Sequence, residues 1–517
     1  MRFSLRTYEP QFRRCLFLIV LFSIPAWLTL KSSAVVDADV WWHLRTGEWI
    51  VQHRWVPYND WFSNSGMGKP WAAYSWLFEV LIQALFSRLG LIGLLVYVYA
   101  LMLAIAAALH SLVRKFESRL AYSVALTVLA LLALAPYHTP RPWLFTILFF
   151  IIELDVLVSV RRSRSYRTLL ILPLLFALWA NLHIQFVYGL FVLGVSALED
   201  PINQLLRNRT GVSGEPERPL PFRTMVLVMA ACLVAILVNP YHFRIYAIVL
   251  DTLRLTGLYE LISELQAMQF RAISDWLVLL LTLAAAFALG RRRNIDPFWG
   301  LLLLTGAFLS FRSGRDSWFV VIVAVAIIPK AHSATPITMR NTLSKAQVMI
   351  VVGAVGILLL IANRTANLSE VNLQRAVART YPARAAQIVE ERGYQGPLYN
   401  HFDWGGYLIW RLPHLPVSID GRSNLHNPDR IKQSLRVWNG ETNWASDSEL
   451  AAAHLVIAPK NLSLTQLLRL DPRFEQVYED ELAVVFVAKV RWGSFEDCNN
   501  EGLSGHRLFM KLKAPIE

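Results

Sequence analysis

The sequence predicts a polytopic α-helical membrane protein of about 11 spans with one soluble α/β domain at its C-terminal end. Of its 517 residues, 55% are hydrophobic and only 17% are charged, and the mean hydropathy is +0.40. Such a composition is typical of membrane proteins. The long apolar runs fall in residues 1–362, the expected transmembrane domain, whereas residues 363–517 alternate like a globular domain.

A membrane helix needs roughly 17–25 apolar residues, or fewer within a bundle. Two regions are ambiguous: residues 168–199 form two short helices or one broken helix, and Trp76–Leu89 is an interfacial helix or a further span. No clear cleavage site precedes Asp37, so we expect the first span to be retained. The candidate spans are residues 14–36, 90–112, 119–136, 142–160, 168–181, 184–199, 222–239, 275–290, 297–311, 316–330 and 346–362.

The distribution of basic residues predicts the orientation of these spans. With a cytoplasmic N-terminus, the cytoplasmic segments hold more than twice as many lysines and arginines as the opposite ones, including Arg161–Arg164 and Arg291–Arg293. This bias follows the positive-inside rule. We therefore expect a multi-pass protein of the bacterial inner (plasma) membrane with a periplasmic or extracellular C-terminal domain. Loop charges explain the net charge of +13, so no nucleic-acid partner is expected.

Five polar clusters fall on the predicted outer side of the membrane. Because polar groups near a bilayer usually face a bundle interior or a cavity, five clusters on one side predict a single extracytoplasmic cavity. The clusters are Asp37–His43, Thr139–Pro142, Asn181–His183, Asn239–His242 and Phe311–Asp316.

Two carboxylates open the outer loop 37–74. Asp37 and Asp39, at positions i and i+2, could share a divalent cation such as Mg²⁺ or Mn²⁺, or one could act as a general base. The structural alternative is a solvated acidic cap. His43 is a ligand, a phosphate partner or a packed loop histidine, and Asp60 is expected to form a turn rather than to be a second catalytic acid.

Three arginines at the ends of spans are candidates for phosphate binding. Arg141 stands between two prolines, which stiffen the backbone, and an anchored guanidinium suits a bidentate phosphate contact. Arg312 and Arg315 lie at i and i+3 at the end of another span. The alternative for each is a side chain that reaches the lipid headgroups. His183, with Asn181, serves either the site or helix packing.

The C-terminal domain is expected to be α/β. Asp403 precedes Trp-Gly-Gly, which predicts a tight turn that approaches a ligand, and Asp420–Arg422 ends a predicted strand, where α/β domains place binding residues. Turn chemistry alone is the alternative for both. The predicted elements are helices 370–392, 428–437 and 463–470 and strands near 396–400, 415–420, 454–458, 474–478 and 482–488.

These residues together resemble the glycosyltransferase-C superfamily, polytopic enzymes that use polyprenyl-phosphate-linked sugars. Its members carry one or two acids directly after the first span, as at Asp37 and Asp39. Phe402–Tyr407 is similar to a degenerate Trp-Trp-Asp-Tyr-Gly motif of oligosaccharyltransferase catalytic subunits, and Asp420–Asn424 falls where that family has an Asp-rich strand end. Almost the whole chain resembles uncharacterised bacterial membrane proteins that share a DxDxWWH first outer loop.

The chain also departs from that pattern. It has no clear second acidic pair in a later outer loop, where Asp251 and Glu260 or Glu264 are loose substitutes. The soluble motif lacks its double tryptophan, so recognition of a peptide acceptor is not implied. Several branches of the superfamily work without a metal.

The resemblance implies a glycosyltransferase that moves a sugar from a polyprenyl-phosphate-linked donor to a glycan or protein acceptor at the extracytoplasmic face. Asp37 or Asp39 would be the base, with or without a cation. The alternative is a non-enzymatic transporter or an assembly subunit of a cell-envelope polysaccharide system. The expected donor-phosphate contacts are His43, Arg141, His183, Arg312 and Arg315, and the expected acceptor or domain contacts are Asp403, Trp404, Tyr407, Asp420 and Arg422.

Overall fold

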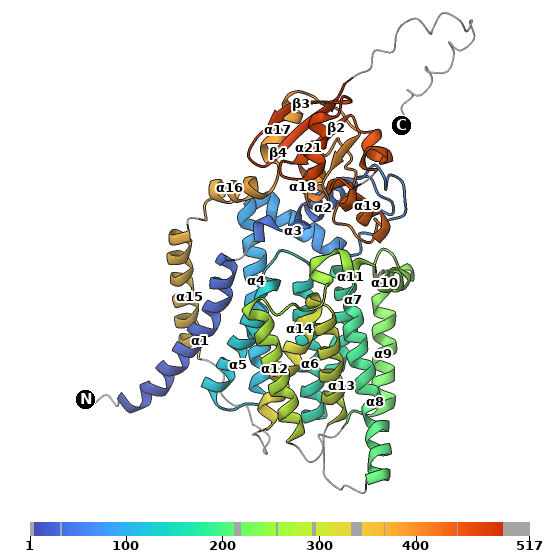
Figure 1. The fold of residues 1–517 in the computed structure, drawn as a ribbon. Helices are drawn as coiled ribbons and strands as arrows, with labels where there is room; N and C mark the ends of the chain where they lie inside the picture. The colour runs from blue at the N-terminus through green and yellow to red at the C-terminus, as the bar shows by residue number, and fades with distance from the viewer. Residues whose placement is uncertain are drawn as a thin grey trace, which may run out of the picture.

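The protein is a helical bundle with a small α/β unit at one end (Figure 1). The structure, a computed structural model, describes residues 5–31, 34–210, 219–254, 257–291, 296–331, 344–366, 368–441 and 443–489. Two further helices, α2 and α3, lie between the bundle and the α/β unit.

Each predicted apolar segment contains a bundle helix. Among the described residues, four helices are long and apolar enough to cross a membrane: Phe12–Leu30 within α1, and α4, α6 and α12. The other apolar helices are shorter, so the number of spans stays a prediction. The bundle helices are α1 (Leu5–Lys31), α4 (Leu91–Arg114), α5 (Leu120–Ala133), α6 (Trp143–Ser163), α7 (Ile171–Leu182), α8 (Phe186–Thr210), α9 (Phe222–Ile236), α12 (Ile273–Gly290), α13 (Pro297–Arg312), α14 (Ser317–Ile327) and α15 (Lys345–Ala366).

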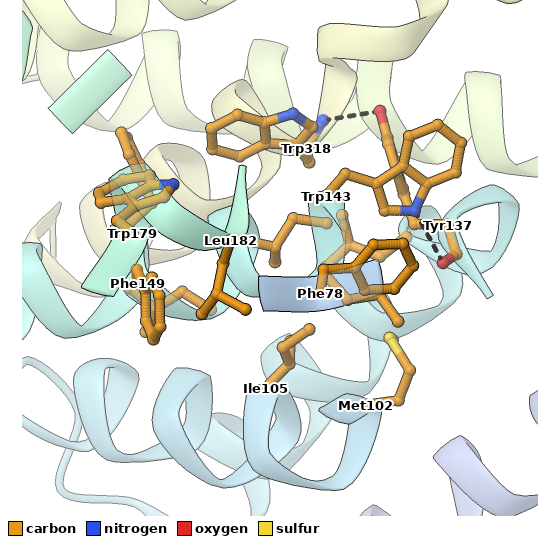
Figure 2. Packing of buried hydrophobic residues seen from close by; sticks show 14 of the residues in the cluster. Phe78, Met102, Ile105, Tyr137, Trp143, Phe149, Trp179, Leu182 and Trp318 are labelled. Carbon is orange, nitrogen blue, oxygen red and sulfur yellow. Dashed lines mark hydrogen bonds between the residues drawn. The ribbon is translucent and has the colours of Figure 1, made fainter. Parts of the chain in front are cut away.

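The centre of the bundle is built around α14. Every residue of this helix is buried, as expected for an apolar helix that is surrounded by others. Aromatic side chains pack near its outer end, where the backbone N–H of Trp318 donates to the hydroxyl of Tyr137, 3.2 Å away (Figure 2). The ambiguous region 168–199 forms two helices, α7 and α8, joined at His183.

The outer loop 37–74 is more ordered than predicted. It contains α2 (Val40–His53), which packs against α3 (Trp76–Leu89) so closely that a Cβ on Gly47 would lie 2.1 Å from the carbonyl oxygen of Glu79. At about 1.5 Å per residue, the 14 residues of α3 extend roughly 21 Å, less than the ~30 Å hydrocarbon core. Its length and its position beneath the α/β unit favour the interfacial alternative (Figure 1).

Short elements connect the bundle helices and carry several of the polar clusters. The segment between α9 and α12 crosses the outer end of the bundle as a series of short helices. The elements of this segment are α10 (Arg244–Arg254), α11 (Leu258–Leu261) and η4 (Ser263–Leu265). The other short elements are η1 (Ala34–Val36), η2 (Ala135–Tyr137), η3 (Tyr166–Leu170), η5 (Gly314–Asp316) and η6 (Ile328–Ala331).

The α/β unit has one four-stranded sheet of order β1-β2-β4-β3. β1 pairs with β2 in parallel, with Leu398 opposite Leu455, and the other two pairings are antiparallel. Its elements are α16 (Glu370–Thr380), α17 (Ala383–Glu391), β1 (Leu398–Asn400), α18 (Phe402–Arg411), α19 (Pro428–Trp438), η7 (Trp444–Ser446), α20 (Ser448–Ala451), β2 (Leu455–Pro459), α21 (Ser463–Leu470), β3 (Phe474–Glu479) and β4 (Ala483–Ala488).

Three predicted features of this unit are wrong. The helix 370–392 is two helices, because the chain turns at Tyr381–Pro382. The segment 415–420 is not a strand of the sheet; it pairs with the outer loop, where the N–H of Val417 donates to the carbonyl of Phe62. The Asp-Trp-Gly-Gly segment is not a turn but part of α18.

Candidate functional site

Arg141 lies at the centre of a cluster of three carboxylates at the outer end of the bundle. Its Nε lies 2.7 Å from Oδ2 of Asp37, its Nη1 2.8 Å from Oδ2 of Asp39, and its Nη2 2.9 Å from Oε1 of Glu264. The three acids come from two segments: the short connection between η1 and α2 supplies Asp37 and Asp39, and η4 supplies Glu264. The structure therefore brings together both predicted acids and one predicted arginine.

The two loop acids differ in environment. Asp37 has 4% of its side chain exposed, and its Oδ1 accepts the backbone N–H of Asp39, so both of its oxygens are engaged. Asp39 has 22% of its side chain exposed. Burial raises the pKa of Asp39 to about 6; Arg141 opposes this shift, and the neighbouring Asp37 adds to it. Asp39 is therefore the better placed of the two to accept a proton near neutral pH.

A cavity of about 340 Å³ opens beside this cluster. Its charged lining residues are Asp37, Glu264, Asp275, Arg271 and Arg315, and Trp143 and Tyr137 supply aromatic surface. Asp39 and Arg141 lie behind Asp37 and do not line this cavity themselves. The volume lies within the range of small-molecule sites in proteins, roughly 300–1,000 Å³. Such a cavity, with carboxylates and a guanidinium on one wall, can hold an anionic ligand next to a base.

Of Arg312, the last residue of α13, and Arg315, in the following η5, only Arg315 borders the cavity. Its guanidinium lies 5.7 Å from the ring of Trp143, and it also borders a second cavity of about 140 Å³ that reaches Ser423 and Asn424 of the α/β unit. Arg312 is exposed and lies over the ring of Tyr259 at 4.8 Å. The phosphate-binding prediction thus has better geometric support at Arg315 than at Arg312.

The two predicted histidines are buried behind the cluster. The Nδ1 of His43 is hydrogen-bonded to Oε1 of Glu79 at 3.1 Å, and burial holds the pKa of His43 well below its usual value. The Nδ1 of His183 is hydrogen-bonded to Oγ1 of Thr146 at 2.8 Å. Neither histidine lines the two cavities. Their contacts fit helix packing, the structural alternative for each.

The three predicted contact residues in α18 lie in different environments. Asp403 has 70% of its side chain exposed and lies 3.7 Å from Nδ1 of His401. The indole N–H of Trp404 donates to the carbonyl of Thr380, and Tyr407 packs edge-on against Trp41, with ring centroids 5.2 Å apart. Trp404 is thus bonded within the α/β unit, Tyr407 packs at the contact between that unit and α2, and Asp403 faces solvent.

Arg422 and Asp420 form a closed ion network with Asp60 of the outer loop. Arg422 holds Asp420 through Nε and Nη2, both at 2.8 Å, and its Nη1 lies 2.6 Å from Oδ1 of Asp60. The pair with Asp60 is fully buried; burial opposes ionisation of Asp420, but Arg422 and His426 outweigh it and lower the pKa of Asp420. Asp60 also accepts the backbone N–H groups of Phe62 and Ser63, the predicted turn contacts. This network can join the loop to the α/β unit but offers no open surface to a substrate.

Two glycines of the α/β unit touch the acidic loop directly. A Cβ on Gly421 would lie 2.3 Å from Oδ1 of Asp39, and a Cβ on Gly406 would lie 2.6 Å from the carbonyl oxygen of Ala38. The Gly-Gly segment of α18 therefore permits close helix packing rather than a turn. The α/β unit forms one wall of the environment of Asp39.

Comparison with known proteins identifies the fold. No family model and no curated protein matches the sequence. The structure is similar to the crystal structure of the Archaeoglobus fulgidus oligosaccharyltransferase tethered by a disulfide to an acceptor peptide containing the NVT sequon, with a TM-score of 0.51 and 11% identity over 88% of this chain and 70% of that one. The chain shares the overall fold of that oligosaccharyltransferase.

Two further structures from the same organism score lower. They are the apo form of that oligosaccharyltransferase, with a TM-score of 0.49, and the archaeal oligosaccharyltransferase AglB in complex with an inhibitory peptide and a dolichol-phosphate, with a TM-score of 0.48. Both are 11% identical to this chain, covering 86% and 88% of it and 69% and 70% of the other chain respectively. The comparison with the acceptor-bound form alone supports the fold.

Glu264 was given too little weight from the sequence alone. Of the three acids considered in the later outer loop, Glu264 contacts Arg141, Asp251 pairs with Arg254 on the surface, and Glu260 is exposed. A possible signal was its place in a short polar stretch, Ser263–Gln266, between two apolar segments. Because Glu264 and Arg141 are 123 positions apart in the sequence, no local pattern indicates their contact.

The cluster does not fit a divalent cation as it stands. Mg²⁺ and Ca²⁺ bind carboxylate oxygens at about 2.0–2.6 Å. In this site the Arg141 guanidinium already occupies the point on which the three carboxylates converge, at 2.7–2.9 Å. Among the described residues, no group of three histidine, cysteine, aspartate or glutamate side chains is arranged to hold a metal ion.

Proposed function

We propose that this protein is a membrane glycosyltransferase that takes a sugar from a polyprenyl-phosphate-linked donor and transfers it to an acceptor at the extracytoplasmic face. The observation that carries the proposal is the position of Asp39. Its carboxylate has a pKa of about 6 and lies next to Arg141 and Asp37, and Asp37 lines a cavity that Arg315 also borders. A base of this pKa beside an anion-binding cavity suits displacement at a sugar–phosphate bond.

The roles follow from which atoms are free. Oδ2 of Asp39 is held by Arg141, and its Oδ1 faces the α/β unit, so Asp39 can take the proton from an acceptor hydroxyl or amide. As the acceptor atom bonds to the anomeric carbon of the donor, the bond from that carbon to the phosphate oxygen breaks. The electron pair leaves with the phosphate, and the proton stays on Asp39.

Arg315 is proposed to bind the departing phosphate. Its Nε is buried without a hydrogen-bond partner, and no ion pair to its side chain is found in the described part of the chain. A buried N–H group without an acceptor is costly unless a ligand satisfies it, and a charge-assisted bond from Nε to phosphate would do so. Because Arg315 borders both cavities, a phosphate there would lie between the larger cavity and the α/β unit.

The α/β unit is proposed to close the acceptor side. Ser423 and Asn424 border the smaller cavity, directly after Arg422, which fixes that segment to the outer loop. Asn424 also accepts the indole N–H of Trp71 and is thereby held in place. The segment Ser423–Asn424 thus offers polar groups to an acceptor from a rigid support.

The test compares envelope glycans and lipid-linked sugars, by mass spectrometry, between a deletion strain and strains that carry wild-type or variant protein. Wild type and Asp251→Asn, an exposed acid of the later outer loop, should restore the missing glycan, and Asp39→Asn should not. Donor should accumulate in the deletion strain. If glycans and donors are unchanged in the deletion strain, or if Asp39→Asn restores them fully, the protein is not this enzyme. Altered distribution of a lipid between leaflets with intact transfer would favour a transporter.

A further inference from the structure

The guanidinium of Arg141 is held rigidly as a cation within the acidic cluster. Pro140 and Pro142 flank it; its backbone N–H donates to the carbonyl of Thr139 at 2.8 Å, and its carbonyl accepts the hydroxyl of Tyr97 at 3.0 Å. Only 11% of its side chain is exposed. All three side-chain nitrogens are used, one for each carboxylate, so none of the nitrogens is left without an acidic partner.

The ring of Trp143 covers one side of this cation. The centre of the guanidinium lies 4.8 Å from the centroid of that ring, a distance at which a cation–π contact is favourable. The surrounding carboxylates raise the pKa of Arg141 further, so the group stays charged at every relevant pH. A permanent charge, fixed in orientation, is what a bound metal ion would otherwise supply to Asp37, Asp39 and Glu264.

The three carboxylates would repel one another without a central cation. A guanidinium carries one charge and bonds in one plane, whereas a divalent ion would draw the same oxygens to about 2.0–2.6 Å. The two cannot share the position, since each of the three oxygens is already within 2.9 Å of an Arg141 nitrogen. A change that removes the guanidinium leaves three oxygen ligands from two segments directed at one point.

We infer that Arg141 takes the place of a divalent cation in this site, so that the protein gathers and orients its acids without a metal. Arg141 is thus a positioning residue: it fixes Asp37, Asp39 and Glu264, and it leaves the donor phosphate to Arg315. This inference deepens the proposed function, but it can be tested on the full-length protein without any substrate. The wild-type protein should not bind divalent cations at this site, and removing the Arg141 side chain should create a cation site.

The experiment measures Mn²⁺ binding to full-length protein in nanodiscs, by loss of the free-ion electron paramagnetic resonance signal. Wild type should bind no stoichiometric Mn²⁺ at micromolar concentrations. Arg141→Gly should bind about one ion per chain, because three hard oxygen ligands become available. Arg271→Gly is the matched control: it lies on the same cavity and contacts none of the three acids, so it should behave as wild type.

Two more variants keep the test decisive. Arg141→Gly combined with Asp37→Asn should lose the new site, and Arg141→Lys, which keeps a positive charge there, should not gain it. Stoichiometric binding by wild type that Asp37→Asn abolishes would overturn the inference, even if Arg141→Gly does not fold. A folded Arg141→Gly protein that binds no more Mn²⁺ than wild type would overturn it as well. Transfer activity is scored separately: wild type that binds no Mn²⁺ yet transfers nothing refutes the proposed function alone.

Discussion

Asp39 at the start of the outer loop lies against Gly421 of the α/β unit, so closely that a Cβ on Gly421 would be 2.3 Å from Oδ1 of Asp39. The two residues are 382 positions apart in the sequence but form one side of the candidate site. The oxygen of Asp39 that Arg141 does not hold therefore faces the α/β unit, and small changes at Gly421 should act on the chemistry rather than on the bundle.

Gly421→Ala should reduce transfer while leaving donor binding intact. The added methyl group must displace Asp39, and a misplacement of about 1 Å can cost on the order of 100-fold in rate. Single-turnover kinetics with saturating donor would measure the loss. Gly353→Ala is the control, because a Cβ there meets nothing within 4 Å. Equal rates for Gly421→Ala and wild type would show that the α/β unit does not constrain the base.

The pKa of Asp39 predicts how activity depends on pH. A base must be ionised, so transfer should fall about tenfold per pH unit below about pH 6 and stay level above it. Asp39→Asn should lose at least about 100-fold at pH 7.5. A pH profile of kcat/KM measures both effects, and an inflection near pH 4 would mean that the carboxylate is not desolvated during turnover.

The same pKa has an opposite effect on stability. The folded protein holds the Asp39 proton more tightly than an unfolded chain, whose aspartate has a pKa near 3.8, so this group's contribution to stability declines as pH rises from there to about 6. The change in Tm on Asp39→Asn, relative to wild type, should therefore be more favourable at pH 8 than at pH 5. Thermal unfolding followed by intrinsic tryptophan fluorescence would measure it, and a difference independent of pH would contradict it.

Arg315→Gln should weaken donor binding. A lost charge-assisted contact to phosphate is worth roughly 1.5–3 kcal/mol, or about 10- to 150-fold in Kd. Arg312→Gln should change Kd little, because Arg312 is exposed over Tyr259 and lines neither cavity. Binding of a fluorescent polyprenyl phosphate to protein in nanodiscs distinguishes them, and equal losses for both variants would mean that the arginines act only through general charge.

Arg422→Met should destabilise the protein without acting on chemistry directly. It leaves Asp60 and Asp420 buried without their cation, and breaking a buried pair costs about 3–5 kcal/mol. Arg384→Met, which removes an exposed pair with Glu391, should cost less than about 1 kcal/mol. Denaturant unfolding in detergent compares the two variants, and matching midpoints would show that the buried Arg422 network does not stabilise the fold.

Structural features that depend on a single local segment of the chain could be predicted from the sequence. The apolar segments became helices because hydrophobic length alone favours them, and Arg141 could be singled out because two prolines flank it. Prediction failed where the partner is distant. Gly405 and Gly406 suit a turn as well as a helix that packs closely, and only the positions of Asp420 and Ala38 decide between these. Likewise, Val417 pairs with Phe62, which no local pattern indicates.

Asp60 and Arg422 are 362 positions apart in the sequence, so the ribosome makes the outer loop long before the α/β unit that contacts it. Asp37, Asp39 and Asp60 are synthesised early, but the arginine that buries Asp60 and the glycine that covers Asp39 follow only after every bundle helix has been made. During biogenesis the nascent chain therefore carries an open, unsupported acidic loop. Maturation of the site is tied to completion of the polypeptide, and a chain that stalls or is cleaved before residue 422 lacks the arginine that joins the outer loop to the α/β unit.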